Sequence, residues 1–172
     1  MACPIQLSMP VDCADAVGGV KKLFLAVFPD NGLSYSPTVA SGVITAWAGA
    51  AAKFFTYSVR AGVATGSGDS ATSPTAGTTA YTHAFTTQVE KITAAKNVEL
   101  DNVIKNRLLT IVQLQDDTYW LQGYKNGMMV TSMNVNPGTA MTDFNGYKLN
   151  GTGTEPGHWL QVSSSLIATL SA

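Results

Sequence analysis

The chain has 172 residues, of which 45% are hydrophobic and only 12% are charged, and its formal net charge is -1. This length suits a single domain with a sizeable core, and the absence of a Lys/Arg-rich run argues against tight nucleic-acid binding. The charged share is about half that of an ordinary globular chain. A surface covered by other subunits has this composition because interface cores are depleted in charge. The alternative interpretation is a Ser/Thr-rich β-protein.

Two further classes are disfavoured. The sequence contains no apolar run of about 18 residues, so we expect no membrane-spanning helix and no membrane partner. The N-terminal residues lack a basic region followed by an apolar stretch, so we expect no secretory signal. Cys3 and Cys13 are the only cysteines; we expect two free thiols, although one disulfide is possible.

The first predicted strand covers residues 21–28, which are apolar on both faces and should therefore be covered on both sides. A second short strand is predicted over 43–47. Residues 48–52 are ambiguous between a helix and a bend, because alanine favours a helix whereas Gly49 does not.

A long hairpin arm is predicted over residues 53–92. Residues 53–64 alternate at period two and place Phe55 and Tyr57 on one face, and residues 81–92 do the same with Tyr81 and Phe85. The intervening residues 65–80 are almost all small and polar, and we expect them to form the flexible loop of the arm. That loop either orders on a partner or is a plain connection.

The one predicted helix covers residues 97–108, with Asn97 as its N-cap and apolar residues at helical spacing. The rest of the chain reads as strands, including a last one over 158–170. Residues 115–130 form a hairpin closed at Asn126-Gly127, a pair that favours tight turns. This hairpin is apolar on both faces. The predicted fold is mainly β, a sandwich or barrel of eight to ten strands with one packed helix.

No catalytic group is predicted. His83 lies within an alternating strand, and no Gly-x-Ser-x-Gly motif is present. Asp116 and Asp117 suit a turn better than a carboxylate pair. The stretch TGSGD at 65–69 is not followed by Gly-Lys-Ser/Thr or by a helix, so it is not a phosphate-binding loop. We therefore expect no enzyme activity, no cofactor and no metal site.

Two segments carry a family resemblance. CADAVGGVKKLFLAVFPDNG at 13–32 and TIVQLQDDTYWLQGYKNGMMVTSMNVNPGTAMTDFNGYKLNGTGTE at 110–155 resemble virion proteins of tailed bacteriophages that infect Bacteroidetes-type hosts, in particular tail tube proteins. The shared features are a Gly-Gly-Val-Lys-Lys entry to an apolar strand, Asn-Gly turns and a Pro-Gly-Thr-Ala step. They cover a little over a third of the chain directly.

The resemblance implies a β-sandwich or barrel with a helix at its side and a long hairpin. It also implies a subunit, made in the host bacterial cytoplasm, that forms rings, commonly hexamers. These rings stack into the tube of the virion tail. The partners would be other copies, other tail or head-tail proteins and, transiently, DNA in the lumen. A hairpin between a core and a neighbouring subunit would be apolar on both faces. The candidate interface residues are Phe55, Tyr57, Tyr81, Phe85, Tyr119, Trp120, Met128 and Met129.

Two other functions remain open. One is a different virion component, such as a head-tail joining, decoration or cargo protein. The other is a carbohydrate-binding module, because Trp47, Trp120 and Trp159 could stack on sugars. A sugar-binding module predicts exposed, clustered aromatic side chains, whereas subunit contacts bury them.

Overall fold

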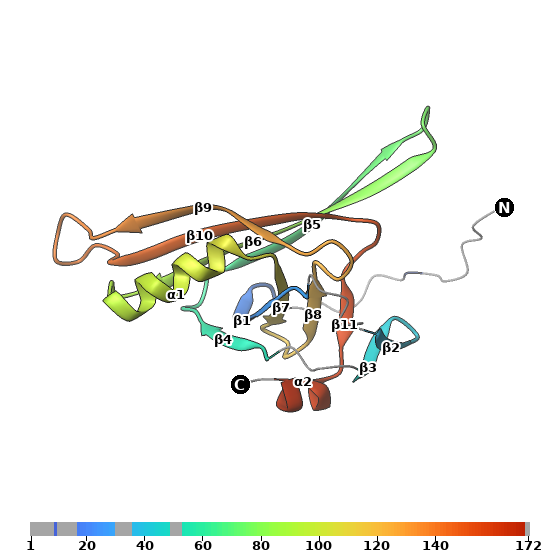
Figure 1. The fold of residues 1–172 in the computed structure, drawn as a ribbon, viewed down its shortest axis with the longest axis horizontal. Helices are drawn as coiled ribbons and strands as arrows, with labels where there is room; N and C mark the ends of the chain where they lie inside the picture. The colour runs from blue at the N-terminus through green and yellow to red at the C-terminus, as the bar shows by residue number, and fades with distance from the viewer. Residues whose placement is uncertain (1–8, 10–16, 30–35, 49–52, 171–172) are drawn as a thin grey trace.

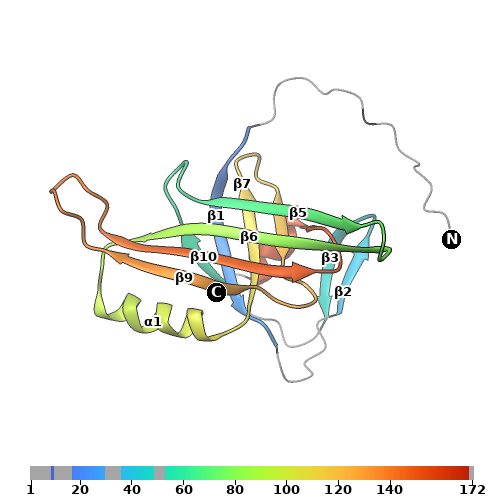
Figure 2. The same cartoon turned by 90° about the horizontal axis from the view of Figure 1, so that it is seen from above.

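The fold is mainly β, and the described residues form two separate sheets and two helices (Figure 1). The computed structural model describes residues 9, 17–29, 36–48 and 53–170. A seven-stranded sheet has the strand order β2 (Ser36–Ala40), β3 (Val43–Ala48), β11 (Leu160–Val162), β8 (Tyr119–Gln122), β7 (Leu108–Leu114), β1 (Val20–Val27) and β4 (Phe55–Ser58). A four-stranded antiparallel sheet has the order β5 (Thr65–Ser73), β6 (Thr78–Glu90), β10 (Gly146–Glu155) and β9 (Met129–Asn136). Figure 2 shows the strands of the two sheets crossing steeply.

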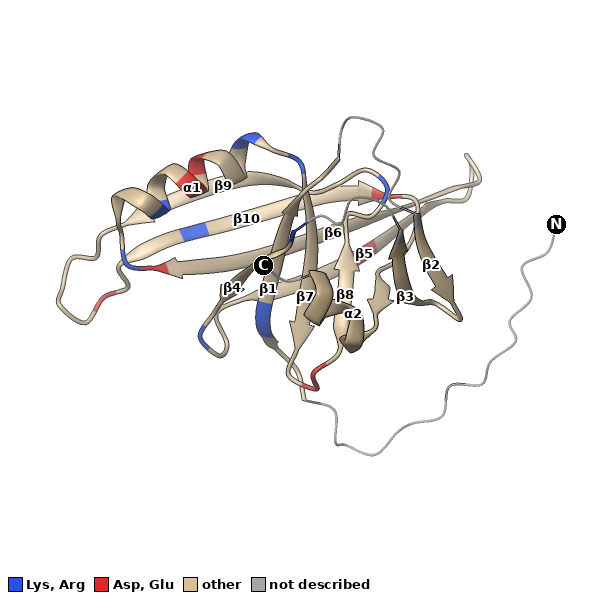
Figure 3. Cartoon of the chain, turned by 60° about the horizontal axis from the view of Figure 1, so that its bottom comes forward, with Lys and Arg blue, Asp and Glu red and all other residues tan. Residues whose placement is uncertain are grey.

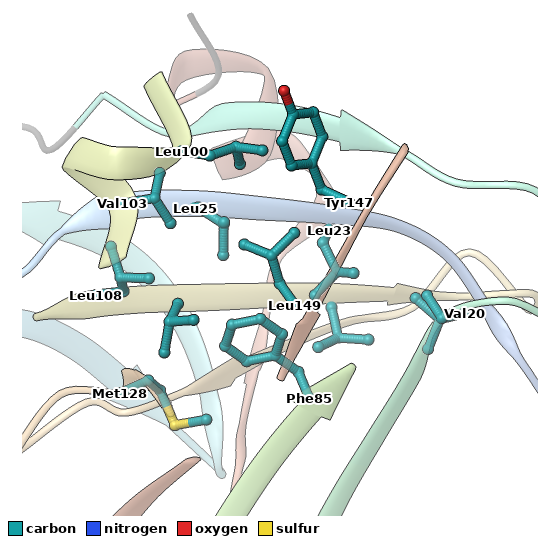
Figure 4. Close-up of a cluster of buried hydrophobic side chains, with 13 residues drawn as sticks. Val20, Leu23, Leu25, Phe85, Leu100, Val103, Leu108, Met128, Tyr147 and Leu149 are labelled. Atoms are coloured by element: carbon teal, nitrogen blue, oxygen red, sulfur yellow. The ribbon is translucent and has the colours of Figure 1, made fainter. Parts of the chain in front are cut away.

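The centre of the seven-stranded sheet, at β1 and β7, is buried on both faces, as the apolar runs of these strands predict. Leu23 and Leu25 of β1 face the four-stranded sheet and pack in one core, together with Phe85 and Leu149 (Figure 4). Phe24, the residue between them, packs in a second core on the opposite face. Because successive strand residues point to opposite faces, a strand between two cores is apolar throughout.

Each helix closes one of these cores. Helix α1 (Ala94–Lys105) begins three residues before the predicted start, and its N-cap is Thr93, whose hydroxyl accepts the Lys96 N–H at 3.3 Å, rather than Asn97. Leu100 and Val103 of α1 are buried in the core between the sheets. No helix in the described part of the chain is long and apolar enough to cross a membrane.

Helix α2 (Ser164–Leu170) corrects the strand predicted over 158–170. Only Leu160–Val162 is a strand there. Ile167 and Leu170, three residues apart, share one face of α2 and close the second core. A period of three fits the buried residues of this segment better than the predicted period of two.

The predicted arm is built differently from the expectation. Residues 55–58 form β4, which pairs with β1 at the edge of the seven-stranded sheet. The hairpin consists of β5 and β6, joined by a turn at 74–77, and β5 pairs along its whole length from Thr65↔Thr86 to Ser73↔Thr78. The flexible loop predicted over 65–80 is therefore mostly strand. Its tip projects beyond the sheet, because β10 stops at Glu155 opposite Tyr81 (Figure 1).

The predicted hairpin over 115–130 is wrong. Strand β8 lies in the seven-stranded sheet and β9 lies in the four-stranded sheet, so the turn between them carries the chain from one sheet to the other. Gly123 and Gly127 have positive φ angles of 73° and 77°, and the Gly127 N–H donates to the Gly123 carbonyl at 3.1 Å. Both conformations favour glycine, which explains why Gly123 and Gly127 occur in the turn. The turn sequence does not determine which strands it connects.

Candidate assembly surface on the four-stranded sheet

The outer face of the four-stranded sheet is made mainly of uncharged polar side chains. Burial alternates along β6 and β10, so that every second residue points away from the core. The strand registers extend this face onto β5 and β9. We call this surface the polar face; its residues are Thr65, Ser67, Asp69, Thr82, Ala84, Thr86, Gln88, Glu90, Met129, Ser132, Asn134, Lys148, Asn150, Thr152 and Thr154.

The polar face carries little charge (Figure 3). Asp69, Glu90 and Lys148 are its ionisable residues. The Glu90 carboxylate forms an ion pair with Arg60, and the Lys148 ammonium lies 5.7 Å from the centre of the Phe144 ring. Apart from Ala84 and Met129, the other side chains of the face carry uncharged hydroxyl or amide groups, which hydrogen-bond to water and to each other.

Cross-strand hydrogen bonds order these side chains. The hydroxyls of Thr65 and Thr86 lie 2.7 Å apart, and the Asn150 amide donates to the Ser132 hydroxyl at 2.9 Å. Such pairs between neighbouring strands contribute roughly 0.2–1 kcal/mol each. The face is therefore a regular array and not a set of independent surface side chains.

Glycines occupy the opposite, inner face of the same strands. A Cβ at Gly68 would lie 2.8 Å from Nε1 of Trp159, one at Gly153 would lie 3.0 Å from the Met128 sulfur, and one at Gly151 would overlap the Phe85 ring. The Gly-x-Gly spacing within TGSGD and NGTGT thus lets large side chains approach the backbone, while the Ser and Thr between the glycines point outward.

Both outer strands of this sheet have a free edge within the described part of the chain. Strand β5 pairs only with β6, and β9 pairs only with β10. Because the sheet has four antiparallel strands, β5 and β9 run in opposite directions. Neither edge is blocked by lysine or proline, since β9 contains no charged residue or proline and β5 contains only Asp69. Strand β9 has one irregularity in its pairing, opposite Asn150 and Gly151, and it contacts helix α1.

A buried carboxylate holds the turn that links the two sheets. Glu155, at the end of β10, is only 3% exposed. Its two oxygens accept the backbone N–H groups of Lys125 at 2.9 Å and Asn126 at 2.8 Å. The Asn126 amide donates to the Thr154 carbonyl at 2.7 Å. These bonds fix where β9 starts and therefore where the sheet ends.

His83 is buried on the inner face of β6. Its Nδ1 accepts the Gly123 N–H at 3.4 Å, and its ring meets the Trp159 ring edge-on at 6.3 Å. Burial lowers the pKa of His83, while Glu155 and the Gly157 backbone oppose that shift and His158 adds to it. The geometry indicates a neutral packing residue between the sheets.

The candidate interface residues separate into three groups. Phe55 and Met129 are about half exposed, at 52% and 51%. Four others are partly buried: Tyr57, Tyr81, Tyr119 and Trp120. The remaining two, Phe85 and Met128, are fully buried in the core of this chain. Their prediction as interface residues is wrong, because Phe85 points inward on β6 and Met128 lies beneath Gly153.

The sequence interpretation singled out aromatic residues and missed the polar face. The small polar residues over 65–80 were predicted as a flexible loop, and the polar residues that alternate with Tyr81 and Phe85 were not assigned to an outer face. Among the described residues, no group of three His, Cys, Asp or Glu could hold a metal ion. Cys3 and Cys13 lie outside the described residues.

The three tryptophans do not form one exposed cluster. Trp47 meets Phe54 edge-on at 6.2 Å beside the second core. Trp120 and Trp159 line a pocket of about 350 Å³ with Leu114 and His158. The Trp120 indole N–H donates to the Thr118 hydroxyl at 2.9 Å, so it already has a partner.

Comparison with known proteins identifies no relative: no protein-family model, no curated protein and no solved structure matches this chain.

Proposed function

We propose that this chain is a non-enzymatic structural protein that assembles into rings, which stack to form the tail tube of a bacteriophage. The observation that carries the proposal is a polar face with little charge, on a sheet whose two free edges run in opposite directions. The sequence resemblance to tail tube proteins supports it independently.

The strand directions suit closure of a ring. If the copies are arranged around one rotation axis with their four-stranded sheets side by side, β5 of one copy meets β9 of the next. Because β5 and β9 run in opposite directions, that joint is antiparallel, like the other pairs of the sheet. A head-to-tail contact of this kind closes when the rotation between copies is a whole fraction of a turn.

The size of such a ring suits a genome channel. Six copies of the four-stranded sheet contribute about 24 strands, and strands about 4.8 Å apart with a tilt of about 40° give a backbone diameter of roughly 45–50 Å. A DNA duplex fits within this width after side chains are added to the wall.

The chemistry of the polar face suits passage of DNA. Protein–DNA affinity comes largely from Lys and Arg groups that neutralise phosphates. The polar face has one lysine, Lys148, against the two carboxylates of Asp69 and Glu90. Hydroxyl and amide groups keep such a wall hydrated but do not bind DNA phosphates tightly.

The first test is negative-stain microscopy with light scattering over a concentration series. The proposal predicts rings or tubes with an open channel. Single rings that never stack would favour a head-tail joining protein. A monomer at every concentration that binds a sugar on a glycan array would overturn the proposal in favour of the carbohydrate-binding module.

The second test asks which face lines the channel. In a chain with Cys3 and Cys13 changed to Ser, Thr152→Cys places a thiol on the polar face and Thr169→Cys places one on α2. In tubes, Thr152→Cys should react with a small maleimide but not with a maleimide on a long polymer, whereas Thr169→Cys should react with both. Equal polymer labelling at both positions would refute a polar lumen wall.

The third test concerns stacking. Ser70 pairs with Tyr81, so replacing residues 71–80 with Asn-Gly shortens the hairpin and preserves its register. Removal of the whole 65–80 segment would delete β5 itself. We expect the shortened protein to form rings that do not stack. Normal tubes from it would show that the hairpin tip is not the axial contact.

A further inference from the structure

A large cavity lies between β4, the end of β6 and helix α1. It has a volume of about 790 Å³ and is lined by residues 55–60, Val89, Glu90, Lys96, Glu99 and Leu100. It shares only Glu90 with the polar face, and its β4 wall belongs to the other sheet. The proposed ring contact between β5 and β9 does not use it.

Two unpaired strand edges border this cavity among the described residues. Strand β4 pairs only with β1, which leaves its second edge free along residues 55–58. Strand β6 pairs with β5 only as far as Thr86, so residues 87–90 lack a partner on that side. Free backbone N–H and C=O groups at an edge are the usual acceptors of an added strand.

The walls of the cavity combine apolar side chains with the charged side chains of Arg60, Glu90, Lys96 and Glu99, so they suit an amphipathic occupant. Tyr57, Val59 and Val89 are partly buried and pack against the main core, and Leu100 is fully buried. Phe55 is 52% exposed. A strand that docks here needs an apolar side chain at every second position to cover this surface.

The N-terminal segment of the chain has that pattern. Ile5, Leu7, Met9 and Val11 alternate with Gln6, Ser8 and Pro10. Pro4 and Pro10 flank a window of five residues, 5–9, and prolines are tolerated at strand ends. The window is one residue longer than the four-residue strand β4. The hairpin tip at 71–80, by contrast, offers no side chain larger than threonine until Tyr81, apart from Pro74.

We infer that this cavity takes residues 5–9 of a second copy of the chain as an added strand on β4. Met9 of the described chain is 88% exposed and so does not fill its own cavity. The inference rests on the self-association of the proposed function, to which it adds a contact away from the polar face. Exchange of an identical segment between copies is a common route to assembly.

The cysteine next to this segment provides a direct test in the full-length chain. With Cys13 changed to Ser, Cys3 is paired in separate variants with Thr56→Cys or Ser58→Cys, one for each possible strand direction, and with Thr152→Cys on the polar face as the control. After mild oxidation, one of the two β4 variants should give covalent oligomers on a non-reducing gel, at least tenfold more than the control.

A matched pair of substitutions tests the alternation. Leu7→Asp places a charge on the apolar side of the segment, and Ser8→Asp places the same charge on the other side. Leu7→Asp should reduce the yield of cross-linked oligomers at least fivefold, whereas Ser8→Asp should leave it within twofold of the parent. Equal effects of the two substitutions would refute docking through one face.

The outcomes separate this inference from the proposed function. Rings or tubes without cross-links from either β4 cysteine would overturn the added strand and leave the ring proposal standing. Cross-linked monomers that migrate faster than the reduced chain would show that the segment folds onto its own β4, which refutes exchange between copies. Intermolecular cross-links in a protein that forms no rings would support the added strand and refute the tube.

Discussion

Glu155→Gln should lower the free energy of unfolding by about 2 kcal/mol. The carboxylate is 3% exposed and accepts two backbone N–H groups, those of Lys125 and Asn126. A glutamine side chain has one acceptor oxygen, so one of these N–H groups would face an NH₂ group. Hydrogen bonds to charged groups contribute roughly 1.5–3 kcal/mol, and a buried donor left unpaired costs a similar amount.

Urea unfolding followed by tryptophan fluorescence measures this loss, under dilute conditions where the protein is monomeric. For a urea m-value of about 2 kcal/mol/M, the midpoint should fall by about 1 M. Glu90→Gln is the matched control, because Glu90 is exposed and its ion pair with Arg60 is worth less than about 1 kcal/mol. A Glu155→Gln midpoint within about 0.2 M of the parent protein would show that the turn is not held by this carboxylate.

Two further predictions concern the interior between the sheets. Burial lowers the pKa of His83, so the unfolded chain binds the proton more readily and stability should fall as the pH drops below about 6.5. In His83→Gln, the urea midpoint should no longer fall between pH 7 and pH 5. If the midpoint of His83→Gln falls as steeply as that of the parent, another group causes the pH dependence. Gly151→Ala should cost about 1–3 kcal/mol, because its Cβ would overlap the Phe85 ring, whereas Gly157→Ala, with open space around it, should be nearly neutral in the same titration. Equal effects of the two glycine substitutions would contradict the close approach at Gly151.

Elements whose buried apolar residues follow a regular pattern could be predicted from the sequence. The unbroken apolar runs at β1 and β7 predicted strands covered on two faces, and Leu23 and Phe24 indeed pack in different cores. The spacing of Leu100 and Val103 predicted a helix with one buried face. Hydrophobic burial dominates in these elements, and its period is directly visible.

Elements whose structure depends on residues far away in the sequence could not be predicted from the sequence. Strand β5 has the composition of a loop, because Gly, Ser and Asp have low strand propensity. It forms a strand because β6 pairs with it and its glycines admit Trp159. Likewise, an Asn-Gly pair suits a hairpin. Here, however, Glu155 binds the turn to the end of β10, so the strand that follows the turn, β9, lies in the four-stranded sheet.

The candidate surface was missed for a related reason. A large apolar residue on a strand can point into the core of its own chain or towards another subunit, and the sequence does not distinguish the two orientations. Phe85 and Met129 were both predicted at an interface, yet Phe85 is 1% exposed and Met129 is 51% exposed. A face of Ser, Thr and Asn has no hydrophobic signal at all, and becomes visible only when the register aligns four strands.

The free edge of β9 allows a sharp test of ring closure. Strand edges of monomeric proteins are commonly blocked by an inward-pointing charge, which β9 lacks. Val135→Lys would add one on the inner side of β9, where the side chain is 48% exposed and can accept a lysine at a cost of about 1 kcal/mol or less. Asn134→Lys adds the same charge on the polar face of the same strand.

Val135→Lys should keep the protein folded but monomeric in sedimentation velocity at concentrations where the parent assembles. Asn134→Lys should still assemble, because its lysine points away from the neighbouring core. If Val135→Lys forms the same rings as the parent, β9 is not the joint between copies. If both variants stay monomeric, the repulsion between added charges, and not the blocked edge, controls assembly. Only a difference between the two neighbouring positions supports strand pairing as the means by which the ring closes.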